Sequence, residues 1–311
     1  MYHQTGKERK KGLSPSTKLF LAILPSIIVC FLYSYRSFWG LGYAFVDYKL
    51  GRNMLECDFV GLKWFQSMFA NAVKRREMFR ILRNTVAMST IGLVTSFVPM
   101  FVAVLLNEIP SRRCKRVTQS LITIPNFIGW VTVYATFYAL LAPGSGIIAG
   151  ILRNAGLIQG NFELMTSADY GWFFMWILGM WKSVGWSTII YLSAISSIDQ
   201  ELYEAAEIDG AGRFQKMRYI TVPLLMPTFI TLVILGVGNF LSSDFDKIFV
   251  FSNAFNRSTV ETIDLYVYDV GMVNGNYSFS TAVGLMKSIV GLGLMWFANT
   301  LSKKIRGQSL F

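Results

Sequence analysis

Six long apolar runs, separated by polar segments, constrain this chain more than any other feature. Each run has about the 20 residues that a helix needs to cross the hydrocarbon core of a bilayer. In lipid, a backbone must satisfy its hydrogen bonds within the spanning segment, so apolar runs of this length predict helices. The sequence therefore predicts an all-α integral membrane protein with six transmembrane helices, at about residues 17–35, 84–106, 117–141, 172–198, 223–241 and 278–301.

The composition agrees with a membrane location. Hydrophobic residues make up 53% of the 311 positions and charged residues only 15%, whereas soluble domains average about 25% charged residues. The net charge of +11 is compatible with nucleic-acid binding, but the basic residues flank the apolar runs and do not line one soluble face. We therefore expect a cytoplasmic basic tail at residues 1–16, a single transmembrane domain at residues 17–311, and membrane lipid rather than nucleic acid as a partner.

The polar stretch at residues 199–222 lies between the fourth and fifth runs and has a pattern of its own. Asp199 is suited to cap a short helix, and Gly210 and Gly212 bracket a turn in which a residue without a β-carbon can adopt a positive φ. Pro223 suits the first turn of the next span. The physical pattern fits either a rigid helical knob outside the bilayer or a loop that merely joins two spans.

The residues of this stretch resemble the EAA signature of ABC importer permeases. The match consists of Glu204-Ala205-Ala206, then Asp209-Gly210-Ala211, then Ile220 and Pro223. Gly212 departs from the signature, because asparagine is more common there. The resemblance implies a type I importer fold with a cytoplasmic coupling helix between spans 4 and 5, whose docking residues on the ATPase would be Glu204, Ala205, Ala206, Asp209, Gly210 and Ala211.

Other runs extend the resemblance over most of the chain. The segments 105–109, 181–186, 198–206, 263–268 and 277–285 are similar to carbohydrate-import permeases, especially the LplB-like group. This resemblance implies import of a complex oligosaccharide or polysaccharide fragment through a pathway shared with a second homologous permease. It also implies two ATP-binding subunits, an extracellular solute-binding protein, and a bacterial plasma membrane with both termini in the cytoplasm.

No GxxxxGK[ST] phosphate-binding loop occurs in the chain. If ATP drives the protein, ATP and Mg²⁺ must therefore bind to partner subunits, and we expect no cofactor on this chain. His3 is the only histidine, which leaves no histidine-based metal site or triad. Cys30, Cys57 and Cys114 are expected on different sides of the membrane or within it, which argues against an intrachain disulfide framework.

Two lysines inside predicted spans are candidates for the substrate pathway. A charge at that depth costs several kcal/mol unless it faces water or a partner, and aromatic rings beside it suit the apolar faces of sugars. The alternative is a structural role: snorkelling, an ion pair with Asp244 or Asp246, or an aromatic belt at the interface. The predicted pathway residues are Trp181, Lys182, Trp186, Tyr191, Asn239 and Lys287.

Two other classes of membrane protein remain to be weighed. A secondary sugar transporter that is not coupled to an ATPase would need repeats and an ion-coupling site of its own, and the sequence has no evident repeat and only basic intramembrane charges. A membrane-embedded enzyme would need a nucleophile, an acid–base pair or a metal cluster, and none stands out. We therefore predict a transport subunit without catalytic residues, with the secondary transporter as the alternative.

Overall fold

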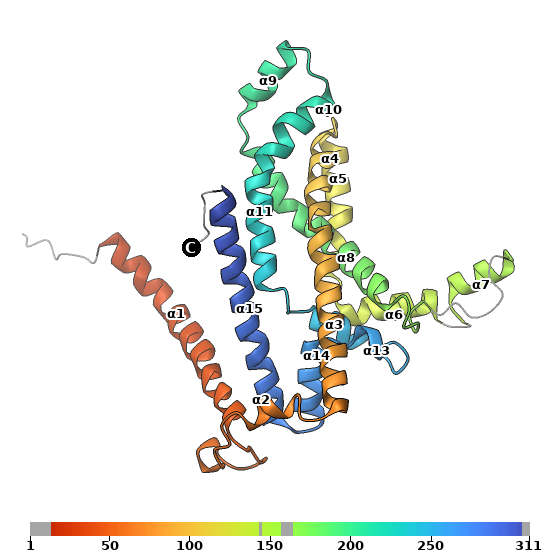
Figure 1. Ribbon diagram of the computed structural model, residues 1–311. Coiled ribbons are helices and arrows are strands. Elements are labelled where there is room, and N and C mark those ends of the chain that lie inside the picture. Colours follow the sequence, from red (N-terminus) through yellow and green to blue (C-terminus); the bar gives the residue numbers. More distant parts are fainter. Residues whose placement is uncertain (1–13, 143–144, 157–163, 307–311) are drawn as a thin grey trace, which may run out of the picture.

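The computed structural model describes residues 14–142, 145–156 and 164–306, and within these ranges the chain is helical (Figure 1). An isolated antiparallel bridge between Val46 and Phe59 is the β-type pairing found there. The longer helices are α1 (Pro15–Trp39), α3 (Ala72–Val94), α4 (Val98–Asn107), α5 (Arg112–Thr123), α6 (Trp130–Leu141), α8 (Gly171–Ser196), α11 (Val222–Gly238) and α15 (Tyr277–Arg306).

Short helices and turns connect these elements. Before α3 lie η1 (Gly40–Phe45), η2 (Met54–Glu56) and α2 (Lys63–Ser67), and η3 (Thr95–Phe97) and η4 (Ile124–Phe127) interrupt longer helices. The later connections contain α7 (Ile147–Asn154), α9 (Gln200–Ile208), α10 (Arg213–Lys216), the π-helical η5 (Met217–Thr221), α12 (Phe245–Phe251), α13 (Arg257–Val260), α14 (Ile263–Tyr268) and the π-helical η6 (Asp269–Val273).

Four described helices are long and apolar enough to cross a membrane, compared with the six predicted spans. They comprise Ser16–Phe45, Ala72–Asn107, Arg213–Gly238 and Tyr277–Thr300, and the bent pair Arg112–Phe127 and Trp130–Leu141 makes a fifth if it counts as one span. The predicted fourth span corresponds to α8, which has 26 residues but includes Lys182 and several hydroxyl side chains. Because protein surrounds α8 on several sides, it does not need a uniformly apolar surface.

The predicted third span is not one continuous helix. α5 and α6 meet at an angle of 100° across a short break. Pro125 lies in the 3₁₀ turn before this break, and Ile128 and Gly129 are extended. Pro125 lacks the N–H group that would continue the hydrogen bonds of α5, and the chain leaves the helical conformation three residues later, at Ile128. The apolar run at residues 117–141 therefore turns sharply at its middle.

The second predicted span also differs at its start. α3 begins at Ala72, where the Asn71 side chain accepts a hydrogen bond from the backbone N–H of Lys74 (2.8 Å). The helix therefore begins well before residue 84, where the span was predicted to start. Within the predicted span, Pro99 is at the first turn of α4, directly after the 3₁₀ turn η3.

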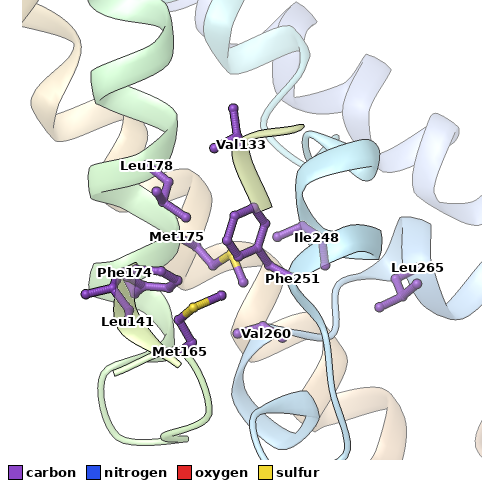
Figure 2. Packing of buried hydrophobic residues seen from close by; sticks show 10 residues of the cluster. All are labelled: Val133, Leu141, Met165, Phe174, Met175, Leu178, Ile248, Phe251, Val260 and Leu265. Atoms are coloured by element: carbon purple, nitrogen blue, oxygen red, sulfur yellow. The ribbon is translucent and has the colours of Figure 1, made fainter. Parts of the chain in front are cut away.

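The largest apolar cluster joins α8 to the connection between α11 and α15 (Figure 2). Phe251 of α12 is its centre, and its ring makes edge contacts with Trp130, Tyr134 and Phe174 at centroid distances of 6.3, 5.2 and 5.9 Å. Edge-to-face aromatic pairs contribute about 0.5–1.5 kcal/mol beyond their buried area. The cluster therefore holds α12 against α6 and α8, and this determines where the charged residues of α12 lie.

A buried carboxylate fixes the same connection to α3. Glu261 is only 3% exposed at its side chain and forms ion pairs with Arg80 and with Arg257, the latter at 2.6 Å. The fully buried Asn84 donates to the backbone carbonyls of Ser258 and Glu261, both at 3.1 Å. Burial lowers the pKa of Arg257, but its bonds to carboxylates outweigh this effect and raise the pKa overall. The guanidinium thus stays charged, and Glu261 keeps its partners.

Helices α5 and α8 approach so closely that only glycine fits at one position. A β-carbon on Gly185 would lie 2.0 Å from the backbone oxygen of Ile122. We expect Gly185→Ala to force α5 away from α8 and to destabilise the protein by about 1–3 kcal/mol, the usual cost of overpacking a core. The measurement is the midpoint of thermal unfolding of the purified assembly in detergent.

Gly284→Ala in α15 is the matched control, because a β-carbon there meets no atom within 4 Å. Alanine inside a helix is favoured over glycine by about 0.5–1 kcal/mol, so this variant should unfold at the wild-type temperature or above it. Equal midpoints for the two variants would show that the α5–α8 approach is not essential.

Candidate functional site

The polar stretch after α8 forms the helical knob that its sequence predicts. The Asp199 side chain caps α9 by accepting from the N–H of Glu201 (3.0 Å), which confirms the predicted cap. Gly210 has φ +79°, and the N–H groups of Gly210 and Ala211 donate to the carbonyls of Glu207 and Ala206 at 3.1 and 2.8 Å. This Schellman geometry ends α9. Gly212, in contrast, has an ordinary φ of −69° and begins α10.

The knob is attached to the rest of the chain by few side chains. The hydroxyls of Tyr203 and Thr221 are 2.9 Å apart, and Lys216 forms an ion pair with Glu207 at 3.3 Å. Figure 1 shows α9 at one end of the molecule, beyond the end of α11. Of the six predicted coupling residues, Ala206 and Ala211 are half-buried, and Glu204, Ala205, Asp209 and Gly210 are exposed.

Large apolar side chains are also exposed on this knob. Ile208 is 88% exposed and Phe214 is 70% exposed. These two side chains add apolar area to the otherwise polar surface of the knob. The sequence pattern predicted the carboxylates and alanines of this surface but did not single out Ile208.

A cavity of about 450 Å³ runs along α8. Aromatic rings, hydroxyl groups, one lysine and one aspartate line this cavity. The indole Nε1 of Trp176 donates to the Thr95 hydroxyl at 2.9 Å, which orients both side chains. The residues that define its chemistry are Thr95, Ser96, Trp172, Trp176, Ser183, Ser187, Tyr191, Asp244 and Lys247.

The six predicted pathway residues do not lie together. Tyr191 lines the α8 cavity, and Asn239 lines a smaller adjoining cavity of about 220 Å³ that shares Ser96 with it. Lys287 lines a separate open depression together with Asp264. The remaining three, Trp181, Lys182 and Trp186, are not among the residues that line these three cavities and instead face the broken helix of α5 and α6.

Lys182 lies against the break itself. Its ammonium donates to the backbone carbonyl of Asn126 (3.0 Å) and lies 5.0 Å from the ring centroid of Trp130. Trp186 makes an edge contact with Phe127 in the same turn, and Trp181 makes one with Phe137 of α6, both at 5.8 Å. The three residues thus hold α8 against the two halves of the broken run.

Lys287 has a partner within the chain. It forms an ion pair with Asp264 of α14, whereas Asp244 and Asp246 were the partners considered from the sequence. The carboxylate of Asp264 also accepts from the backbone N–H and the hydroxyl of Ser243, at 2.8 and 2.9 Å. These contacts connect the segment after α11 to α14 and α15, so Lys287 has a structural role.

Lys247 is the basic residue that sequence reasoning missed. It belongs to α12, between the predicted fifth and sixth spans, and its ammonium is 5.9 Å from the centroid of the Trp130 ring. Burial lowers the pKa of Lys247, and the charge of Asp244 acts in the opposite direction. Nothing in the sequence around Lys247 indicates that its side chain is half-buried beside a cavity.

The comparisons with known proteins match this architecture. Residues 95–307 match the family described as the binding-protein-dependent transport system inner membrane component, which is more than half of the chain. The chain belongs to this family. It is therefore a membrane-embedded permease subunit of an ABC importer, a transport component rather than an enzyme.

Relatives and solved structures agree over nearly the whole chain. Protein LplB of Bacillus subtilis (strain 168) is 36% identical over 94% of this chain and 91% of its own length. The polygalacturonan/rhamnogalacturonan transport system permease protein YteP of the same organism is 39% identical over 98% and 95%. A chain of the bacterial alginate ABC transporter, solved with an alginate pentasaccharide-bound periplasmic protein, has a TM-score of 0.83 at 28% identity and covers 95% and 97%.

The ion pair between Lys287 and Asp264 makes a prediction about stability. Lys287→Met leaves the Asp264 carboxylate, 23% exposed at its side chain, without its counter-charge and should destabilise the protein by about 1–3 kcal/mol. Adding Asp264→Asn removes the unpaired charge but keeps an acceptor for Ser243, so the double variant should regain most of this loss. Thermal unfolding and import of the four variants of the cycle are the measurements.

The same cycle separates a structural role from substrate binding. A structural lysine predicts that the double variant recovers import together with stability. If stability returns but import does not, Lys287 contacts the substrate. If neither returns, the ion pair with Asp264 is not the reason that the protein needs Lys287.

Proposed function

We propose that this chain is one of two permeases that form the pathway for a complex oligosaccharide or polysaccharide fragment. The observation that carries the substrate class is the α8 cavity, whose lining includes both tryptophan rings and hydroxyl groups. Aromatic faces suit the apolar C–H faces of sugar rings, and hydroxyl side chains suit their hydroxyl groups. The relatives named for polygalacturonan and for the acidic polysaccharide alginate support the same class.

The pathway requires more helices than this chain supplies. We infer six spans by adding the bent pair of α5 and α6, and helix α8, to the four continuous apolar helices. α1 stands to one side of the bundle in Figure 1, and the most apolar part of its span is 0% buried. On α15, Trp296 and Phe297 are 74% and 63% exposed. Such surfaces fit a second permease and membrane lipid as partners.

The sidedness follows from the position of α9. In Figure 1 the N-terminal end of α1, the C-terminal end of α15 and the knob all point to the same side of the bundle. If α9 couples to cytoplasmic ATPase subunits, both ends of the membrane domain are cytoplasmic. The solute-binding protein would then dock on the opposite side, where α2 and the end of α14 lie.

Coupling to ATP hydrolysis would run through the knob. Two ATP-binding subunits would hold ATP and Mg²⁺, and each permease would insert its α9 into one of them. The exposed Glu204 and Asp209 supply charges, and Ile208 supplies an apolar contact. A secondary transporter would need no surface for docking to ATP-binding subunits. The membership of this chain in the importer family also argues against a secondary transporter.

The first test is ATP hydrolysis by the purified components. Because this chain has no phosphate-binding loop, we expect no hydrolysis above background when it is purified alone. Co-expressed with its partner permease and ATP-binding subunits, it should purify as one complex that an oligosaccharide-loaded binding protein stimulates. ATP hydrolysis by the isolated chain would contradict the assignment. So would an assembled complex whose ATP hydrolysis no oligosaccharide-loaded binding protein stimulates.

The second test concerns the turn at the end of α9. Gly210 has φ +79°, which a β-branched residue tolerates only with a strain of about 1–3 kcal/mol. Gly210→Val should therefore displace the knob and abolish both import and stimulated ATP hydrolysis, with normal amounts of the chain in the membrane. Glu204→Lys, which reverses an exposed charge, should weaken co-purification with the ATP-binding subunits.

Gly212→Ala is the control for Gly210→Val. Gly212 has φ −69°, and a β-carbon there meets only the Gln215 side chain at 3.7 Å. Alanine should fit without strain and leave import intact. Wild-type import by Gly210→Val would mean that the shape of this turn does not matter for coupling.

A further inference from the structure

Two hydroxyl groups join the first helix of the knob to the membrane helix that follows it. The phenol oxygen of Tyr203 in α9 and the hydroxyl of Thr221 in η5 lie 2.9 Å apart. The Thr221 hydroxyl also donates to the backbone carbonyl of Lys216 at 3.5 Å. Thr221 can therefore accept a hydrogen bond from Tyr203 while it donates one to Lys216, and the contact links α9 directly to the start of α11.

This contact lies on the inner side of α9. Tyr203 and Ala206 are half-buried, whereas the other residues of α9 are exposed. Positions three apart lie on the same side of a helix, so these two residues mark the side of α9 that faces the rest of the chain. Thr221 is only 1% exposed. A hydrogen bond that protein shields from water is electrostatically stronger than one in water, which suits this bond to hold two elements together.

The knob is joined differently to the two membrane helices beside it. On one side, α8 ends at Ser196, and Asp199 is extended (φ −60°, ψ 126°) before α9 begins. On the other side, α10, η5 and α11 continue one another as a single helix, Arg213–Gly238. Rigid secondary elements carry a displacement from one site to another, and an extended residue interrupts such an element. The backbone therefore joins the knob more stiffly to α11 than to α8.

Tyr203 contacts this helix where its geometry changes. Thr221 is the last residue of the π-helical turn η5 (Met217–Thr221), and α11 begins at the next residue. Single π-helical turns within α-helices are rare and occur frequently at functional sites. The bond from Tyr203 thus supports the turn at which the knob becomes the membrane helix.

α11 in turn forms part of the wall of the α8 cavity. Leu232 and Val233 of α11 line the cavity. Nearer the knob, Leu225 is fully buried and belongs to one apolar cluster with Tyr191 and Ile195 of α8. A displacement of α11 therefore moves side chains of the cavity wall and changes how α11 packs against α8.

We propose that Tyr203 is a positioning residue for energy coupling, because its hydrogen bond to Thr221 makes α9 and α11 move as one body. A movement that an ATP-binding subunit imposes on the knob then reaches the α11 wall of the cavity. This inference rests on the proposed function and specifies the path by which ATP hydrolysis acts on the cavity. Without the bond, α9 still docks through its exposed side chains, but it moves without carrying α11 along.

The test measures how much sugar the complete complex imports for each ATP that it hydrolyses. Proteoliposomes hold this chain with its partner permease and ATP-binding subunits, and the binding protein is supplied with a galacturonate oligosaccharide as the probe. Tyr203→Phe removes the hydroxyl and keeps the ring. We expect the sugar imported per ATP to fall about two- to tenfold, the range over which one neutral hydrogen bond shifts an equilibrium. Stimulated ATP hydrolysis and co-purification of the subunits should persist.

Variants of Thr221 show whether the hydrogen bond itself is responsible. Thr221→Val removes the other hydroxyl at nearly constant shape and should lower the ratio as Tyr203→Phe does. The double variant should be no worse than either single variant, because all three lose the same bond. Thr221→Ser keeps the hydroxyl and should retain most of the ratio. Tyr219→Phe is the matched control, since it removes a phenol hydroxyl from a residue of η5 that is 70% exposed, and it should leave the ratio unchanged.

The possible results separate this inference from the proposed function. If the wild-type complex imports no oligosaccharide, the proposed function fails. If the wild-type complex imports it and Tyr203→Phe keeps the wild-type ratio, the inference is wrong and the proposed function stands. The same holds if the effects of Tyr203→Phe and Thr221→Val add, or if Tyr203→Phe loses its ATP-binding subunits on purification. An equal loss of coupling in both single variants and in the double variant supports the inference.

Discussion

The close packing of α8 is the constraint on which the rest of the structure depends. This helix contacts α3, α4, α5, α11, α12 and α13, and at Gly185 the backbone of α5 occupies the space of a side chain. A helix that is enclosed in this way meets protein and an internal cavity as well as lipid. This leaves room on α8 for the polar side chains of Lys182, Ser183 and Ser187, which are costly on a helix that faces only lipid. The same enclosure places Tyr191 and Trp176 on the cavity wall.

The break between α5 and α6 has a comparable influence on the candidate site. If residues 117–141 formed one continuous helix, the whole apolar run would form a single transmembrane helix. The turn at Pro125 and Gly129 instead leaves the carbonyl of Asn126 available to Lys182 and directs Trp130 toward α12. Non-helical backbone at membrane depth is tolerated where protein covers it or a cavity lies beside it. Here α8 covers it.

Two surfaces of the chain expose large apolar side chains. The knob exposes Ile208 and Phe214 next to Glu204 and Asp209, and α1 exposes apolar side chains along its length. The first surface combines charges with apolar groups, which is typical of a protein interface, and the second is uniformly apolar, which suits lipid or another membrane helix. The two exposed surfaces of the chain thus differ in their chemistry.

The sequence by itself determined the helical membrane class and the helix–turn–helix at residues 199–222, because both depend on local rules. Runs of about 20 apolar residues can only satisfy their backbone in lipid as helices, and Asp199 and Gly210 act on their own neighbours, as the observed cap and positive φ show. Only the tertiary structure decided the break after Pro125, the partner of Lys287 and the position of Lys247. Asp264 and Lys287, or Lys247 and Trp130, are far apart in the chain, and whether two such side chains meet depends on how several helices pack at once. No spacing in the sequence records that packing, so the candidate cavity became visible only when α3, α4, α8, α11 and α12 were placed together.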